Sequence, residues 1–278
     1  QNHLPSRRIV SKIQMERKRV PPSSPRLKAG ASGGTFSVKR IFLADVSGNE
    51  VTIGGDDAHH LAYSLRARRG EKITAVDGAG NCAVIELVDF ERDKIKARRI
   101  SELQKVVVER KTILADCLPK QNRFETIIEK ATELGVEKIE PLISERTIMR
   151  PREGKLERWQ KIAKEAAEQC ARDTIPEIGN VRKLDDWLKE ITPLDDDTLL
   201  LFCWESERDT TVREVLSNYR VSGGEKIIVL IGPEGGFSER EVDMIKSAGG
   251  VSVTLGKRVL KTDTAAISVL AMINYEFM

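Results

Sequence analysis

The chain has 278 residues, of which 40% are hydrophobic, so it is long enough for two domains that each bury a core. No apolar stretch is long enough to span a membrane, so we expect no membrane partner. Cys82, Cys117, Cys170 and Cys203 are widely spaced and the chain has only three histidines, which argues against a zinc site and a disulfide framework. We expect reduced thiols in the core and no bound metal.

The net charge of +3 is unevenly distributed. Residues 1–40 contain ten Lys or Arg against one acid, Glu16, a balance of +9, so the rest of the chain carries −6. The head, residues 1–35, is rich in Arg, Ser, Pro and Gly and poor in acid, as transit peptides and disordered segments are. We expect it to direct the protein to a chloroplast or mitochondrion. A disordered RNA-contacting tail or a cloning remnant is the alternative, with the cytoplasm as the location if the protein is bacterial.

A basic strand is predicted in the segment that follows the head. Lys94-Ile95-Lys96-Ala97-Arg98 alternates with period two, which places Lys94, Lys96 and Arg98 on one face and apolar residues on the other. Arg66 can add to this basic patch. The pattern is typical of an RNA-binding strand, and equally of the solvated face of a small barrel.

Strands and helices alternate beyond residue 107. Asn122-x-x-Glu125 resembles a capping box at the start of a helix, and Gly135 can end that helix in the left-handed conformation. A strand is expected directly afterwards, over residues 136–143.

A second helix is predicted over residues 156–172. Its Glu165, Gln169 and Arg172 are spaced i, i+4 and i+7 and therefore share one side. They either face a polar site or form ion pairs on the surface.

Two glycine-rich loops near the C-terminus each follow an apolar run. Residues 226–231 and 251–255, like the earlier run 199–204, have the β-branched or apolar content of buried strands. The loops Ile231-Gly-Pro-Glu-Gly-Gly-Phe237 and Leu255-Gly-Lys-Arg-Val-Leu-Lys-Thr-Asp-Thr264 should therefore leave neighbouring ends of one sheet, where open α/β sheets bind ligands. Plain tight turns are the alternative. Neither loop has G-x-G-x-x-G or P-loop spacing, which argues against ATP or NAD held by phosphate.

Two helices are expected around and after these loops. Ser238-x-x-Glu241 is a capping-box pattern that starts the first. The second, over residues 265–277, is apolar on almost every side, so it must be buried in a core or against a second subunit.

Six stretches match a family pattern in the right order: Arg40-Ile41-Phe42; His60-Leu61 with Leu65-Arg66, Gly70 and Asp77-Gly78-Ala79-Gly80; Lys130 to Val136; Glu165 to Arg172; Gly232 to Gly236; and Leu255 to Thr264. In these stretches the chain resembles the ribosomal RNA uridine-N3 methyltransferases of the RsmE type, in the SPOUT superfamily. Its departures from the pattern are Lys261 where Arg is usual, Asp263 where Glu is usual, and Cys203-Trp204 where a His-Pro-like pair is common.

The resemblance implies an α/β fold in two domains. Residues 108–278 would form a SPOUT trefoil-knot methyltransferase domain, a mostly parallel sheet flanked by helices. Residues 36–107 would form a small PUA-like β-barrel that binds RNA. Arg40 would contact RNA together with the residues of the basic strand. The resemblance also implies a homodimer. A knot is so rare in protein chains that residue spacing alone would not suggest one.

The implied reaction is methylation of N3 of a specific uridine in small-subunit (16S-type) ribosomal RNA, with S-adenosyl-L-methionine as methyl donor. By the same resemblance the cofactor is held at Gly232, Gly235, Gly236, Leu255, Gly256 and Leu260. The N3 proton must leave, so Glu234 or Asp263 is expected to act as base, and Arg172 or Arg258 to stabilise the imide anion. The alternatives are a related SPOUT methyltransferase acting on another ribosomal or transfer RNA base, and a non-catalytic RNA-binding ribosome assembly factor.

Overall fold

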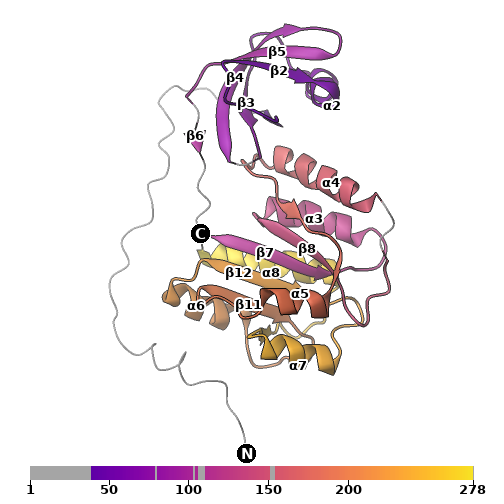
Figure 1. Ribbon diagram of the computed structural model, residues 1–278. Coiled ribbons are helices and arrows are strands. Elements are labelled where there is room, and N and C mark those ends of the chain that lie inside the picture. The colour runs from indigo at the N-terminus through magenta and orange to yellow at the C-terminus, as the bar shows by residue number, and fades with distance from the viewer. Residues whose placement is uncertain (1–38, 79, 103, 106–109, 151–153, 278) are drawn as a thin grey trace, which may run out of the picture. The chain divides into compact units, whose positions relative to one another are not determined.

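The computed structural model describes residues 39–78, 80–102, 104–105, 110–150 and 154–277, which form two sheets with their helices (Figure 1). The predicted head and the predicted domain boundary after residue 107 lie outside the described residues. None of the helices in the described part combines the length and the apolarity that crossing a membrane requires.

The first sheet is mostly antiparallel. Its elements are β1 (Arg40–Phe42), β2 (Glu50–Gly54), α2 (Gly55–His59), the π-helix η1 (His60–Ser64), β3 (Lys72–Val76), β4 (Asn81–Phe90), β5 (Lys94–Arg99) and β6 (Gln104–Lys105). The strands pair in the order β1-β3-β4-β5-β2, β6 pairs with β4, and only β1–β3 is parallel among these pairs. Every second side chain of β5 is buried through Ala97, as the alternation predicts. In the described residues β1 and β2 stand at opposite ends of this order, so the sheet is open where the resemblance implies a closed barrel.

The second sheet is parallel throughout the described pairs. Its elements in chain order are β7 (Lys111–Cys117), α3 (Arg123–Glu133), β8 (Lys138–Ile143), α4 (Lys155–Gln169), β9 (Glu177–Ile178), β10 (Arg182–Lys183), α5 (Leu184–Ile191), β11 (Thr198–Cys203), α6 (Val212–Ser222), β12 (Lys226–Ile231), α7 (Glu239–Ser247), β13 (Val251–Val253) and α8 (Thr262–Phe277). The strand order is β10-β8-β7-β12-β11-β13, with β9 beside β8. The α/β fold expected for the second half of the chain is therefore confirmed.

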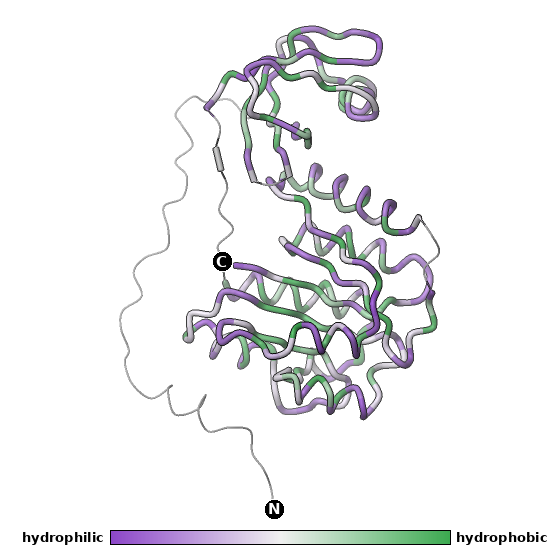
Figure 2. The backbone as a smooth tube through the Cα atoms, viewed as in Figure 1, coloured by the Kyte–Doolittle hydropathy of each residue, from purple (hydrophilic) through white to green (hydrophobic). Residues whose placement is uncertain are grey.

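Helices cover both faces of the parallel sheet (Figure 1). Helices α3, α4, α6 and α8 pack on one face, where Val229 of β12 is buried. Helices α5 and α7 pack on the other, where the next residue, Leu230, is buried. Because successive side chains point to opposite faces, a strand covered on both sides must be apolar throughout. The central strands accordingly run green in Figure 2.

Two sequence expectations about these elements need correction. Helix α3 does begin after Asn122, but the Asn122 side chain makes no capping hydrogen bond, and Glu125 instead accepts bonds from Lys155 and Arg158. Strands β12 and β13 are not neighbours, because β11 lies between them. Strand order depends on which distant segments pair, and spacing within one segment does not encode it.

The other local signals hold. Gly135 follows α3 with φ +83°, the left-handed conformation expected at a helix end. Ser238 and Glu241 form the complete capping box that begins α7. Helix α8 starts three residues earlier than predicted and is apolar as expected, with Ala266, Val269 and Ile273 among its buried side chains.

Candidate active site

A cavity of about 400 Å³ lies at the carboxyl ends of β11, β12 and β13. Three loops line it, over residues 203–208, 231–236 and 253–262, together with Arg123 of α3 and Ala265 of α8. Carboxyl ends of parallel strands share one edge of a sheet, so both glycine-rich loops reach the cavity although β11 separates their strands. The lining includes all six residues expected to hold a cofactor: Gly232, Gly235, Gly236, Leu255, Gly256 and Leu260.

The first loop needs its glycines for specific steric reasons. A Cβ on Gly232 would lie 3.1 Å from the ring of Phe237, and a Cβ on Gly235 would lie 3.2 Å from Cβ of Arg146. Gly236 has φ +67°, and a Cβ there would collide with the carboxylate of Glu205. The loop is thus closely packed against Phe237, Arg146 and Glu205, which restricts its backbone at the cavity.

The second loop supplies apolar walls and exposed cations. Leu255 and Leu260 are half-buried, whereas Lys257 and Arg258 are exposed at the cavity. Gly256 has φ +111° and a Cβ on it would meet nothing within 4 Å, so it is the backbone conformation that requires glycine here.

The third loop was missed by sequence reasoning. Trp204, Glu205 and Arg208 line the cavity from the end of β11, and Lys246 of α7 lies 4.9 Å from the centroid of the Trp204 ring. The signal available was the end of the predicted strand over 199–204. Burial raises the pKa of Cys203, at the start of this loop, to about 12, so its thiol stays protonated at neutral pH.

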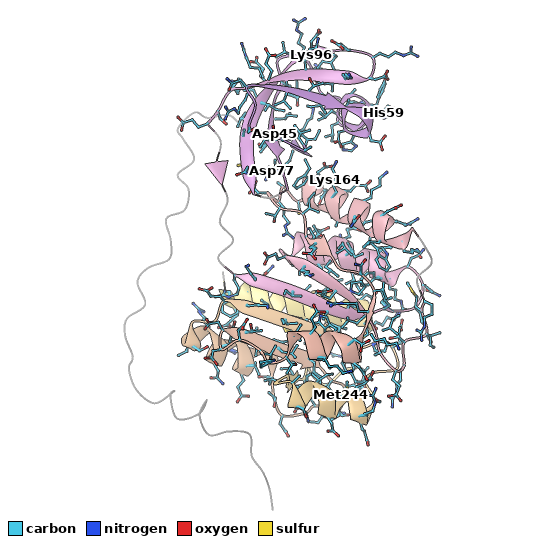
Figure 3. The ribbon with its side chains drawn as sticks, in the orientation of Figure 1. Asp45, His59, Asp77, Lys96, Lys164 and Met244 are labelled. Atoms are coloured by element: carbon cyan, nitrogen blue, oxygen red, sulfur yellow. The ribbon has the colours of Figure 1, made fainter. Side chains whose placement is uncertain are left out.

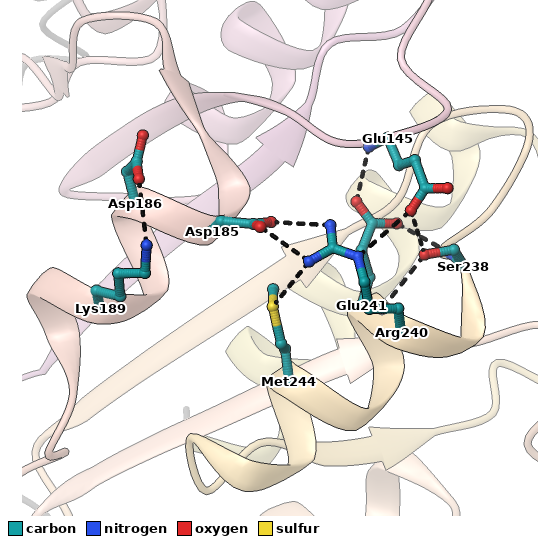
Figure 4. A network of polar contacts seen from close by, with 8 residues as sticks. All are labelled: Glu145, Asp185, Asp186, Lys189, Ser238, Arg240, Glu241 and Met244. Atoms are coloured by element: carbon teal, nitrogen blue, oxygen red, sulfur yellow. Dashed lines mark hydrogen bonds and ion pairs between the residues drawn. The ribbon is translucent and has the colours of Figure 1, made fainter.

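A polar network holds the first loop and α7 to the loop after β8 (Figure 4). The Glu241 carboxylate accepts hydrogen bonds from the backbone N–H of Ser238 at 2.9 Å and of Glu145 at 2.7 Å. The Ser238 hydroxyl donates to the Glu145 carboxylate at 2.8 Å. Arg240 donates to Asp185 of α5 at 2.9 Å. Since Glu241 is fully buried, the two hydrogen bonds that it accepts are shielded from water and orient the loop strongly, whereas the Arg240–Asp185 bond lies at the surface.

Three carboxyl groups lie close together at this edge of the sheet, and one of them, Glu234, lines the cavity. Glu234 lines it and accepts hydrogen bonds from the Lys120 N–H at 2.9 Å and from Arg123 Nη1 at 3.4 Å. Asp263, in the first turn of α8, has a buried Oδ1 without a hydrogen-bond partner in the described structure. Asp116 of β7 is fully buried and has no such partner for either oxygen. Burial first, and then the charges of Glu234 and Asp263, raise the pKa of Asp116 well above its usual range.

Asp116 was not identified from the sequence. The available signal was an aspartate inside the otherwise apolar run Ile113-Leu-Ala-Asp-Cys-Leu118. An acid in the middle of a buried strand usually needs a partner or a function.

Arg172 is not brought to the cavity. Its Nη1 donates to the carbonyl oxygens of Thr132 at 2.9 Å and Val136 at 2.8 Å, and its Nη2 donates to the Thr174 hydroxyl at 3.1 Å. Helix α4 ends at Gln169, so Arg172 leaves the helix side on which the spacing placed it. The contacts make Arg172 a clamp on the end of α3, which leaves Arg258 as the predicted anion-stabilising residue that lines the cavity.

The residues predicted to bind RNA differ in their availability. Arg40 pairs with Asp173 and its side chain is only 13% exposed, so it is committed to an internal ion pair. Arg66 is exposed, with φ +49°.

On β5, Lys94, Lys96 and Arg98 are all exposed. Lys96 (Figure 3) pairs with Glu91 at 2.5 Å, and Arg98 pairs with Glu86 at 3.2 Å. Both pairs are on the surface, where an ion pair contributes little to stability and can exchange for phosphate.

The arrangement of the cavity is that of a ligand site in an α/β fold, with fixed backbone, apolar walls and a few converging charges.

The family model for the RNA methyltransferase domain matches residues 108–274. Ribosomal RNA small subunit methyltransferase E of Synechocystis is 32% identical over 229 residues, which cover 81% of this chain and 72% of the relative. The enzyme of the same name from Bacillus subtilis is 31% identical over 235 residues, covering 81% of this chain and 90% of the relative.

A solved structure has the same fold. The crystal structure of a ribosomal RNA small subunit methyltransferase E from Neisseria gonorrhoeae, bound to S-adenosyl methionine, superposes with a TM-score of 0.76 at 28% identity. The match covers 86% of this chain and 97% of that one. The chain belongs to the RNA methyltransferase family and, within it, to the ribosomal RNA small subunit methyltransferase E group.

Proposed function

We propose that this protein methylates N3 of a uridine in small-subunit ribosomal RNA, with S-adenosylmethionine as the methyl donor. The observation that carries the proposal is the cavity itself, formed by both glycine-rich loops in a chain of this family. The relatives named above act on ribosomal RNA of the small subunit, and one was solved with the cofactor bound.

The residues around the cavity fit this cofactor. Leu255 and Leu260 offer apolar surfaces for an adenine ring, and the glycines leave backbone N–H and C=O groups to read its edge. The buried Oδ1 of Asp263, without a partner in the described residues, suits a cationic ligand. S-adenosylmethionine supplies a methyl group already activated on a positively charged sulfur.

The protein's part in the chemistry is positioning and handling of a proton. Holding two reactants together replaces a bimolecular encounter with an intramolecular one. Glu234 or Asp263 accepts the N3 proton, and the exposed guanidinium of Arg258 stabilises the negative charge that develops on the uracil.

The rest of the assembly belongs to the same proposal. Lys94, Lys96, Arg98 and Arg66 grip RNA from a PUA-like domain, and the second sheet forms a trefoil-knot domain of the SPOUT type. A second copy of the chain covers α8, whose side chains at Met272 and Tyr275 are 41% and 81% exposed. A large apolar side chain left in water on an apolar helix is the expected mark of such an interface.

The test of the reaction is to incubate the purified protein, radiolabelled cofactor and small ribosomal subunits, and to map the modified nucleotide. A methyl group on N3 of one uridine is the expected result. A methyl group on another base or on transfer RNA would make the protein a related methyltransferase. Cofactor binding too weak to detect by calorimetry would favour a non-catalytic assembly factor.

We also propose that residues 1–35 are an organellar targeting segment, on the strength of their composition. Deleting them should leave methylation of purified subunits intact and abolish import. Lost methylation with normal localisation would instead identify an RNA-contacting arm.

A further inference from the structure

Asp116 is a buried acid next to two residues that line the cavity, Ile231 and Glu234. It is paired in register with Ile231 of β12, whose side chain lines the cavity. It follows Leu114 by two positions in β7, so it points to the same face of the sheet as Leu114, the face covered by α3 and α8. Asp263, in the first turn of α8, is close enough to affect its ionisation, and both oxygens of Asp116 are buried and without a hydrogen-bond partner in the described part of the chain.

The charged groups around Asp116 are mostly acids. Glu234 faces it from the loop after β12 and Asp263 from α8, while Arg123 of α3 is engaged with Glu234. The cations of the second loop, Lys257, Arg258 and Lys261, are exposed. On its own strand, Cys117 points to the opposite face. The described residues include no cluster of His, Cys, Asp and Glu arranged to hold a metal ion.

Such a group holds its proton in the free protein. An unpaired buried carboxylate costs several kcal/mol, and two nearby acids add repulsion. A cation placed beside the three acids reverses this balance, because it favours the ionised form of each.

We propose that Asp116 is a specificity residue that releases its proton when the sulfonium of S-adenosylmethionine enters the cavity and keeps it when the uncharged thioether product is bound. The inference rests on the proposed use of that cofactor. Asp116 would add a negative charge to the site only when the ligand is cationic. S-adenosylmethionine is therefore bound in preference to its uncharged thioether product.

Every bond broken and every proton moved in the reaction is accounted for when Asp116 takes part. The S–CH₃ bond breaks with its electron pair left on sulfur, the N3–H bond of uracil breaks, and the N3–CH₃ bond forms. The N3 proton passes to the carboxyl cluster as the sulfonium charge disappears, so Asp116 is neutral again in the product state. Binding of the next cofactor then returns that proton to solvent.

The test is isothermal calorimetry of the full protein in two buffers of different ionisation enthalpy, with S-adenosylmethionine and with S-adenosylhomocysteine as probes. Wild type should release up to one proton per S-adenosylmethionine and close to none per S-adenosylhomocysteine. Asp116→Asn, which mimics the neutral carboxyl in shape, should abolish the release. It should also reduce the preference for S-adenosylmethionine by about tenfold, the equivalent of one unit of pKa coupling.

Asp57→Asn is the matched control, because Asp57 pairs with Lys164 of α4 at 2.8 Å and does not line the cavity. It should retain both proton release and preference. Equal proton release with the two ligands, or no release by wild type at any pH from mildly acidic to mildly basic, would overturn the inference even if Asp116→Asn failed to fold. If proton release occurs as expected but no uridine is methylated, the proposed function fails and the role of Asp116 stands.

Discussion

Substitution of Arg172 tests whether this side chain has the structural role that its contacts indicate. In Arg172→Ala the carbonyls of Thr132 and Val136 lose their guanidinium donor, and so does the Thr174 hydroxyl. Hydrogen bonds to a charged group contribute about 1.5–3 kcal/mol each, and carbonyls at a helix end have few alternative partners. Arg172 is half-buried, so water replaces part of this loss, and we expect unfolding to become easier by about 2–4 kcal/mol.

The assay is urea-induced unfolding, with cofactor affinity measured beside it. Arg158→Ala is the control, because Arg158 is on α4, the helix that precedes Arg172, has a 61% exposed side chain and pairs with Glu125 at 2.7 Å. A surface pair of that kind contributes about 1 kcal/mol or less, so the control should unfold close to wild type. Arg172→Lys should recover part of the stability, since an ammonium can still reach a carbonyl but lacks the fork that serves three acceptors.

The structural assignment would be refuted by one specific pattern. If Arg172→Ala unfolds at the same urea concentration as wild type and binds the cofactor normally, yet transfers methyl groups slowly at saturation, the side chain acts in the transition state. The role first expected from the sequence would then be restored.

Three further predictions concern the cavity and its surroundings. Gly235→Val should push against the Arg146 side chain and weaken cofactor binding about tenfold, as measured by calorimetry. A tenfold loss lies within the cost of about 1–3 kcal/mol that is typical of overpacking. Unchanged affinity would remove this loop from the site. Arg258→Ala should lower the single-turnover rate by about 10²–10³ with little change in cofactor affinity, and a normal rate would exclude it as the anion-stabilising group. Burial alone would raise the pKa of Glu207, but hydrogen bonds from Ser252 and from the N–H groups of 208–210 lower it to about 2. Its stabilisation is therefore present above the unfolded pKa of about 4.3 and lost as pH falls toward 2, so Glu207→Gln should cost about 1 kcal/mol of unfolding free energy at neutral pH and almost nothing near pH 2.

The elements of the second sheet were predicted well because each is specified by residues that lie close together in the sequence. The run 226–231 coincides with β12, and Ser238 with Glu241 gives the capping box of α7. Both depend on contacts between residues close in sequence. The site could be located by the same means, because a glycine-rich turn after a buried strand can be recognised without knowing the strand order.

What the sequence did not predict depends on contacts between distant segments. Arg172 was placed on a helical face, but α4 ends at Gln169 and Ala171 turns with φ +60°, which sends Arg172 to the end of α3. Asp116 faces Glu234 and Asp263 only because β7 lies beside β12 and under α8. No periodicity within β7 reports its neighbours.

The cations and the acids near the cavity lie in different places. This separation explains how a chain whose residues beyond 40 are acidic overall can act on RNA, a polyanion. The residues beyond 40 carry −6, so binding to RNA cannot rely on overall charge. The cations Arg208, Lys257, Arg258 and Lys261 are exposed around the cavity, where phosphates can reach them. Of the three acids, Glu234 lines the cavity, whereas Asp116 and the Oδ1 of Asp263 are buried close to it. RNA binding should therefore weaken steeply with salt, because it releases counterions from exposed sites. Binding of the cationic cofactor close to the buried Asp116 should depend on salt far less, because buried charges are poorly screened.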